Sequence, residues 1–245
     1  MKHRFDPQEY LAANPDAATA VHDGRELSAW GHFVRGGFRE GSEGVPNEIR
    51  STVQAVMEAS LPAPPARALA GRSAADYELG GKFASLGVYS AAVPVLHMDR
   101  PLRILDFGCG YGRLLRFLGV AAPFSAIHGV DEDGRAIAWC REAFRDDERR
   151  GRFSFVANGG VPPLPYASGY FDLVCCVFSF EAMPERPQLA WLSELRRVTR
   201  PEGFLVLSGV RVSLEDYFTV LEQVPPAAAG QPGLVLCMRH PALVI

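Results

Sequence analysis

The chain has 245 residues, of which 48% are hydrophobic, so it is long enough and apolar enough to fold around a substantial core. Its 25 basic and 28 acidic residues leave a formal net charge of −3, which argues against a broad electrostatic footprint for nucleic acid. There is no leader-like apolar start, no transmembrane-length apolar run and no C-x-x-C pair among the cysteines, so we expect a cytoplasmic protein with no membrane span, no metal site and reduced thiols.

The first 45 residues are typical of a small helical module. Asp6-Pro7 and Asn14-Pro15 each place a capping side chain before a proline at the first helical position, which predicts two short helices. Apolar residues then recur at helical spacing, and the glycine-rich stretch 36–44 ends the unit. The segment resembles a helical module found beside enzymatic domains in some bacterial proteins, and the resemblance implies nothing about its role.

Residues 46–98 are expected to form a helical lid and linker region. A helix is predicted over 47–60, and the Pro/Ala-rich segment 61–71 cannot continue it because its prolines lack backbone donors. A second helix is predicted from 74 to about 96. In that helix Tyr77, Phe83 and Tyr89 are candidate lid residues over a bound substrate.

From residue 99 onward, strand-length apolar runs alternate with helical segments. Strands are predicted at 102–107, 126–131, 153–157, 173–178, 204–208 and 234–238, and helices at 112–119, 134–144, 187–199 and 214–224. This alternation predicts an α/β domain with a parallel sheet covered on both faces. Such sheets bind ligands at the carboxyl ends of their strands.

The strongest local signal is the glycine-rich turn DFGCGYG, which follows the first predicted strand. Gly108 and Gly110 would let a ligand lie against bare backbone, whereas a Cβ there would hold the ligand away. Asp106 could orient the turn or accept a hydrogen bond from a ligand ammonium group. The G-x-G-x-G spacing differs from the G-x-G-x-x-G of dinucleotide sites, and no Walker lysine follows. Both observations disfavour a phosphate-bearing cofactor.

A carboxylate stands at the end of the second predicted strand. Asp131, followed by Glu132, could accept hydrogen bonds from both ribose hydroxyls of an adenosine, in NAD or in another adenosine cofactor. Asp131 could also cap the helix that begins near Gly134, and the two roles are compatible.

Four segments, in the same order, resemble the class I methyltransferases that use S-adenosylmethionine (SAM). They are ILDFGCGYGR, GVDED, LPYASGYFDLV and ELRRVTRPEGFLVLS, and together they span roughly residues 100–210. The resemblance implies a Rossmann-like, doubly wound, mostly parallel sheet of seven strands, or a shortened form of it, because little sequence follows residue 208. The SAM-binding domain would cover 99–245, with the N-terminal helices as an extension.

The resemblance also implies roles for the residues of the first two segments. Asp106, Gly108, Cys109 and Gly110 would line the methionine part of SAM, or of its product S-adenosylhomocysteine (SAH). Asp131 would hold the ribose.

The remaining site residues are expected around the adenine and the transferred methyl group. Glu132 would lie near the adenine, and Asn158 and Gly159 stand where the family commonly has an adenine-binding aspartate; an Asn carbonyl can accept the same hydrogen bond. Phe178 follows the fourth strand near the methyl group. Glu181 is a weak candidate for a catalytic base, with a solvated loop residue as the alternative.

The function predicted is methyl transfer from SAM to a small-molecule, lipid-like or glycan acceptor. Two alternatives stay open, namely a non-catalytic SAM-binding or scaffolding protein and, less favoured, an NAD-dependent oxidoreductase. Nothing in the sequence indicates the oligomeric state. Cys175, Cys176 and His128 are expected to be structural, and the mixed-charge run 141–152 is expected to be a solvated helix end because its charges nearly balance.

Overall fold

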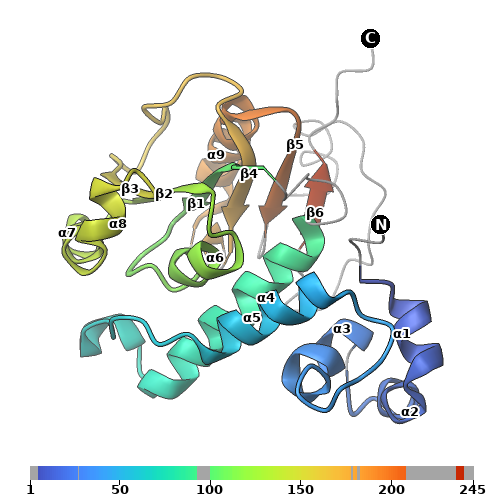
Figure 1. Cartoon of the computed structure of the whole chain (residues 1–245). Coiled ribbons are helices and arrows are strands. Elements are labelled where there is room, and N and C mark those ends of the chain that lie inside the picture. Colours follow the sequence, from blue (N-terminus) through green and yellow to red (C-terminus); the bar gives the residue numbers. More distant parts are fainter. Residues whose placement is uncertain are drawn as a thin grey trace.

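A mostly parallel sheet forms the centre of the molecule. The computed structural model describes residues 5–26, 28–92, 100–177, 179–180, 183–207 and 236–239. The strands are β1 (Arg103–Phe107), β2 (Ala126–Asp131), β3 (Phe153–Ala157), β4 (Phe171–Cys176), β5 (Thr199–Leu207) and β6 (Leu236–Arg239). They lie in the order β3-β2-β1-β4-β5-β6 (Figure 1). Strands β1 to β5 are parallel, and β6 pairs with β5 in the antiparallel sense. The Rossmann-like α/β fold is confirmed, with six strands in the described part of the chain against the seven expected.

Two strands have the bounds predicted from the sequence, and two others begin earlier than predicted because their first residues pair with a neighbouring strand. Strands β2 and β3 have the predicted bounds. Strand β4 begins at Phe171 rather than at 173, and β5 begins at Thr199 rather than at 204, because Phe171 and Thr199 pair ahead of a register shift. The predicted helix 214–224 lies outside the described residues.

Helices cover both faces of this sheet, as predicted. They are α5 (Ala74–Ala92), α6 (Leu115–Ala121), α7 (Gly134–Ala143), α8 (Arg145–Arg149) and α9 (Glu185–Val198). Helix α4 (Asn47–Glu58) packs against α5 and α6. Leu115 and Ile137 pack in the core on the face of α6 and α7, whereas Trp191 and Leu195 of α9 pack on the opposite face. Helix α6 begins three residues later than predicted, since Gly112 has a φ of 68° that no α-helix accommodates. None of the described helices has the length and apolarity needed to cross a bilayer.

The N-terminal segment contains more helix than the sequence analysis predicted. Helices α1 (Pro7–Ala13) and α2 (Pro15–His22) are the two predicted, while α3 (Ala29–His32) and a π-helical turn at Phe33–Gly37 were missed. Asp6 caps α1 as expected, accepting hydrogen bonds from two backbone N–H groups. The Asn14 side chain does not cap α2, because its Oδ1 accepts from the Glu43 N–H at 3.1 Å, while its amide nitrogen donates to the backbone carbonyls of Tyr10 and Glu43.

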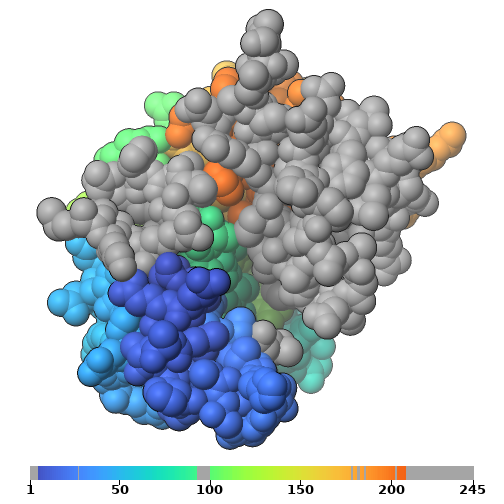
Figure 2. All heavy atoms as spheres, turned by 90° about the vertical axis from the view of Figure 1, so that its right-hand side faces the viewer, coloured from blue at the N-terminus to red at the C-terminus, as the bar shows by residue number. Residues whose placement is uncertain are grey.

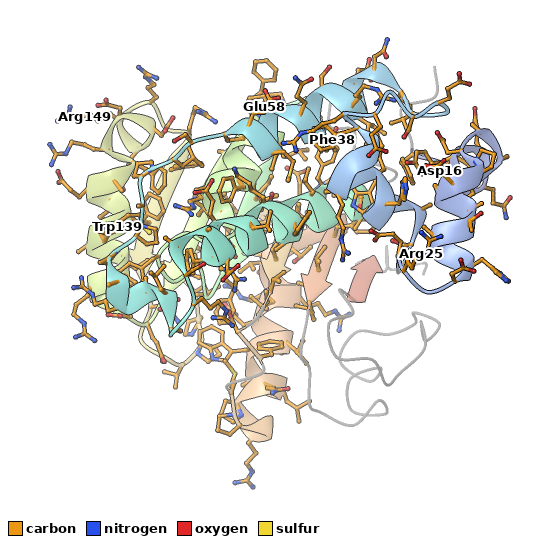
Figure 3. All side chains as sticks on the ribbon, turned by 90° about the horizontal axis from the view of Figure 1, so that it is seen from below. Asp16, Arg25, Phe38, Glu58, Trp139 and Arg149 are labelled. Atoms are coloured by element: carbon orange, nitrogen blue, oxygen red, sulfur yellow. The ribbon has the colours of Figure 1, made fainter. Side chains whose placement is uncertain are left out.

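These N-terminal helices share one hydrophobic core with α4, α5 and α6. Tyr10 and Phe33 belong to the same buried cluster as Leu86 and Phe117. Figure 2 shows the N-terminal helices in blue at one side of the molecule, directly beside the following segment in lighter blue. In Figure 3 Phe38 lies inside, toward α4, whereas Asp16 and Arg25 are exposed.

This shared core contains two of the three aromatic residues expected in a lid. Phe83 and Tyr89 pack within it, and the Tyr89 hydroxyl contacts Thr52 Oγ1 at 3.3 Å. Their assignment to a lid was therefore wrong, because α5 uses this face to bury α4. Tyr77 is different, since it lies beside the turn after β1 with the Arg113 guanidinium 5.3 Å from its ring centroid.

Candidate functional site

Three polar segments follow neighbouring strands and meet at the carboxyl edge of the sheet. The turn after β1 holds Gly108 and Gly110, Asp131 ends β2, and Asn158 follows β3. The Gly110 N–H donates to Asp131 Oδ2 at 2.7 Å, and the Asn158 N–H donates to the Asp131 backbone carbonyl at 3.0 Å. Asp131 therefore ties the three segments together.

A cavity of about 400 Å³ opens at this edge. Its lining includes Gly108, Asp131, Glu132 and Asn158, which the sequence analysis had singled out separately. An adjoining hollow shares Glu132 and Asn158 with it and adds Gly159. The volume lies in the range of sites that enclose a small ligand, roughly 300–1,000 Å³. Residues from three strand ends thus border one small-molecule-sized space.

The two glycines of the turn have different reasons to lack a side chain. Both adopt left-handed backbone, with φ of 75° at Gly108 and 50° at Gly110. A Cβ on Gly110 would have no atom within 4 Å, so the backbone there faces open space. A Cβ on Gly108 would instead collide with the side chain of Ser179, whose hydroxyl donates to the Phe107 and Gly108 carbonyls. A Gly108 side chain would therefore obstruct the protein itself, and its effect on a bound ligand stays a prediction.

Asp106 lies beneath the turn rather than on the cavity surface. It is 2% exposed, and its Oδ2 accepts a hydrogen bond from the Leu115 N–H at 3.2 Å. This contact joins the end of β1 to the first residue of α6. The pKa of Asp106 is raised to about 7, chiefly by burial; the Leu115 N–H lowers it in part, and the nearby charge of Asp131 adds to the rise.

Asp131 keeps acceptor capacity for a ligand although both of its oxygens already accept hydrogen bonds. Oδ1 accepts from the Asp133 N–H at 2.9 Å and Oδ2 from Gly110. Each carboxylate oxygen has two acceptor positions, so two remain for a partner in the cavity. The α7 cap is Asp133, which accepts from the Arg135 N–H at 2.9 Å. The alternative assignment of that cap to Asp131 was therefore wrong.

The two cysteines nearest the turn are buried. Cys109 is 4% exposed, and its Sγ lies 3.6 Å from the Gly110 carbonyl oxygen, which Cys140 Sγ also approaches at 3.5 Å. Burial raises the pKa of both thiols, so they stay protonated and unreactive at neutral pH. In the described part of the chain, no three His, Cys, Asp or Glu side chains gather as a metal site would require.

The sequence analysis missed several residues of the cavity wall. Phe107, Gly160, Met183 and Trp191 also line it. Trp191 lies on α9 and packs against Phe107 with ring centroids 4.6 Å apart. A large aromatic residue on the helix after the fourth strand was the available signal. Phe178 and Glu181, the remaining predicted site residues, lie outside the described residues.

Comparison with known proteins gives a consistent result for the central segment. Residues 104–203 match the family model described as "Methyltransferase domain". "Methyltransferase GfsG" of Streptomyces halstedii is 28% identical over 58% of this chain and 50% of its own length. "Demethylmenaquinone methyltransferase" of Thermotoga maritima is 27% identical, over 56% of this chain and 57% of its own.

Another relative has a name that points to a different acceptor. "Ribosomal RNA large subunit methyltransferase G" of Streptomyces coelicolor is 31% identical over 44% of this chain and 29% of its own length. The chain spans about half the length of the first two relatives and less of the third.

Proposed function

Since residues 104–203 belong to the class I methyltransferase family, whose cofactor is SAM, we propose that this chain binds SAM at the carboxyl edge of its sheet and transfers the methyl group to a small-molecule acceptor. One observation carries the proposal. The turn after β1, the end of β2 and the residue after β3 border a single cavity, and the Gly110 N–H of that turn donates to Asp131 on the cavity wall.

The residues around the cavity suit the parts of SAM. The methionine part would lie along the turn, against Gly108 on the cavity wall and the open backbone at Gly110, and the Asp131 carboxylate would accept hydrogen bonds from the ribose hydroxyls. Asn158 offers a side-chain carbonyl to the adenine amino group, with Glu132 beside it. Bound SAM supplies an electrophilic methyl group on a positively charged sulfur. A positive charge above the turn would favour the ionised form of Asp106. Because the pKa of Asp106 is about 7, such a charge would change its ionisation near neutral pH.

The charges of the cavity wall favour a small acceptor over RNA. The described residues that line it include Asp131 and Glu132 but neither lysine nor arginine. Binding of a nucleic acid backbone depends on such cations. The chain's net charge of −3 points the same way.

The test is transfer of a labelled methyl group from SAM in the presence of two acceptor panels. One panel contains phenols, quinols and hydroxylated lipids, and the other contains ribosomal and transfer RNA. We expect labelled product and SAH with a member of the first panel only, and loss of both in Asp131→Ala. Asp16→Ala, which removes an exposed carboxylate on α2, serves as the matched control and keeps activity.

Label in RNA would contradict the proposed acceptor class. SAH binding without transfer to either panel would favour the non-catalytic alternative.

A further inference from the structure

A separate cavity of about 560 Å³ lies at the opposite edge of the sheet, where the strands begin. It is rich in arginine, and we refer to it as the arginine cavity. Its charged lining residues are Arg100, Arg103, Arg150, Arg152, Arg200 and Asp172. Arg103 is the first residue of β1, Arg152 precedes β3, and Arg200 is the second residue of β5. A strand of five or six residues, about 17–20 Å, separates this edge from the proposed cofactor site.

Positive charge is in excess at this cavity. Asp172 lies 2.6 Å from both Arg100 Nη2 and Arg200 Nε, and its second oxygen accepts the Arg103 N–H at 2.9 Å. Arg152 is paired with Asp147 at 2.8 Å. Five guanidinium groups therefore meet two carboxylates, in a chain whose net charge is negative. Such a concentration of like charge is unfavourable unless an anion relieves it.

Two of the five arginines are available to a ligand. No carboxylate among the described residues lies within ion-pairing distance of the Arg103 or Arg150 guanidinium, and both residues are exposed. Arg103 instead lies 4.7 Å from the ring centroid of Tyr170. The buried Nε of Arg152 has no hydrogen-bond partner in the described part of the chain, so one further donor is unsatisfied.

The rim of the arginine cavity carries an exposed aromatic ring. Phe124 is 80% exposed although it lines the cavity. A large apolar side chain left in water beside a charged pocket offers a surface for a flat ring, and arginine forks match phosphate oxygens in pairs. The two features together suit a ligand with a planar ring and phosphate groups.

We propose that the arginine cavity binds a small ligand of the nucleoside diphosphate class, with its phosphates on Arg103 and Arg150 and its ring on Phe124. A longer polyanion such as RNA fits less well. The acidic residues Asp146, Asp147 and Glu148 of α8 flank Arg150 and would repel a backbone extending past the cavity. This proposal is independent of the methyl acceptor, because the two sites lie at opposite edges of the sheet.

The test is calorimetric titration of the full chain with ADP, AMP and pyrophosphate at low ionic strength. We expect ADP to bind more tightly than AMP, and Arg103→Gln/Arg150→Gln to lose at least tenfold in ADP affinity. Arg145→Gln/Arg149→Gln is the matched control, since it removes two charges from α8 whose side chains are 52% and 72% exposed. Figure 3 shows Arg149 pointing away from the body of the protein. The control should bind ADP within twofold of the unaltered chain.

Two further measurements distinguish the contribution of the ligand's ring from that of its phosphates, and loss of the binding site from loss of the fold. Phe124→Ala should weaken ADP binding severalfold while leaving pyrophosphate binding unchanged. The affinity for SAH should be the same in Arg103→Gln/Arg150→Gln as in the unaltered chain, which also shows that the variant folds. The proposal fails if neither ADP nor pyrophosphate binds, or if the two double variants lose the same amount of ADP affinity. It also fails if single-stranded RNA binds tenfold more tightly than ADP through the same two arginines.

Discussion

Asp106 and Asp131 are neighbouring carboxylates whose surroundings give them different chemistry. Asp131 is partly exposed and holds two backbone N–H groups, whereas Asp106 is buried with one such donor. Burial disfavours the ionised form, and one hydrogen bond does not compensate, so the pKa of Asp106 rises to about 7. The ionisation of Asp106 therefore makes the free energy of unfolding depend on pH.

We predict that Asp106→Asn changes this pH dependence. The pKa in the folded state, about 7, exceeds the ordinary 3.8, so the contribution of Asp106 is complete below pH 4 and is lost as pH rises through 7. Asparagine still accepts the Leu115 N–H and cannot ionise. The variant's free energy of unfolding, relative to that of the unaltered chain, should rise by about 2–4 kcal/mol between pH 4.5 and 7.5. Denaturant titrations at both pH values measure it.

Comparison with the unaltered chain removes the opposing effect of His128, whose pKa is lowered to about 4 by burial and by Arg103. A difference between the chains that stays constant with pH would show that Asp106 ionises normally.

The two glycines of the turn should respond differently to alanine. Gly110→Ala meets no atom, so it should fold at a cost of about 1–2 kcal/mol for its left-handed backbone and lose at least tenfold in SAH affinity. Gly108→Ala collides with Ser179 and should be less stable by a further 1–3 kcal/mol, part of which Ser179→Gly restores. Thermal unfolding and SAH titration of the variants separate the effects. Equal stability of the two single variants would contradict this account.

The sequence allowed part of the candidate site to be predicted, and the physical reason is local. Gly108 and Asn158 directly follow strands and Asp131 ends one, so the strand pattern alone brings them to one edge. Trp191 reaches the cavity through the packing of α9 against the sheet, which no local spacing reveals. The Asp106 environment was similarly hidden, because burial depends on how the turn folds over the strand end.

At the scale of elements, the N-terminal helices are part of the core on which α5 and α6 rest. Phe33 is fully buried in the cluster that also contains Leu86 of α5 and Phe117 of α6. The sequence indicated separate short helices correctly, since caps and prolines are local signals. Their shared core could not be predicted, because an apolar helix face does not indicate which neighbouring element it packs against.

We predict that Phe33→Ala destabilises the whole molecule rather than one end of it. Removing a fully buried aromatic side chain costs about 3–5 kcal/mol, and the shared core transmits that loss to α5 and α6. Thermal unfolding should remain a single transition at lower temperature. Leu79→Ala, at a 42% exposed position of α5, is the control and should change stability by under about 1 kcal/mol. Two separate transitions, with one unchanged, would show that the N-terminal helices unfold independently.

In the molecule as a whole, the two edges of the sheet carry different functional groups. The carboxyl edge carries Asp131, Asn158 and the glycine turn, and the amino edge carries the arginine cavity. The alternating pattern predicted the first edge because ligand sites follow strands in this fold. It did not predict the second. The near balance of charge over residues 141–152 gave no sign that Arg150 and Arg152 line a cavity together with arginines of β1 and β5.

The central claim, that the carboxyl edge is a SAM site, is tested most directly by calorimetric titration with SAH and NAD in parallel. The account predicts micromolar binding of SAH, at least a tenfold loss in Asp131→Ala, and no binding of NAD. Binding of NAD without SAH, or SAH binding that is unaffected by Asp131→Ala, would contradict it.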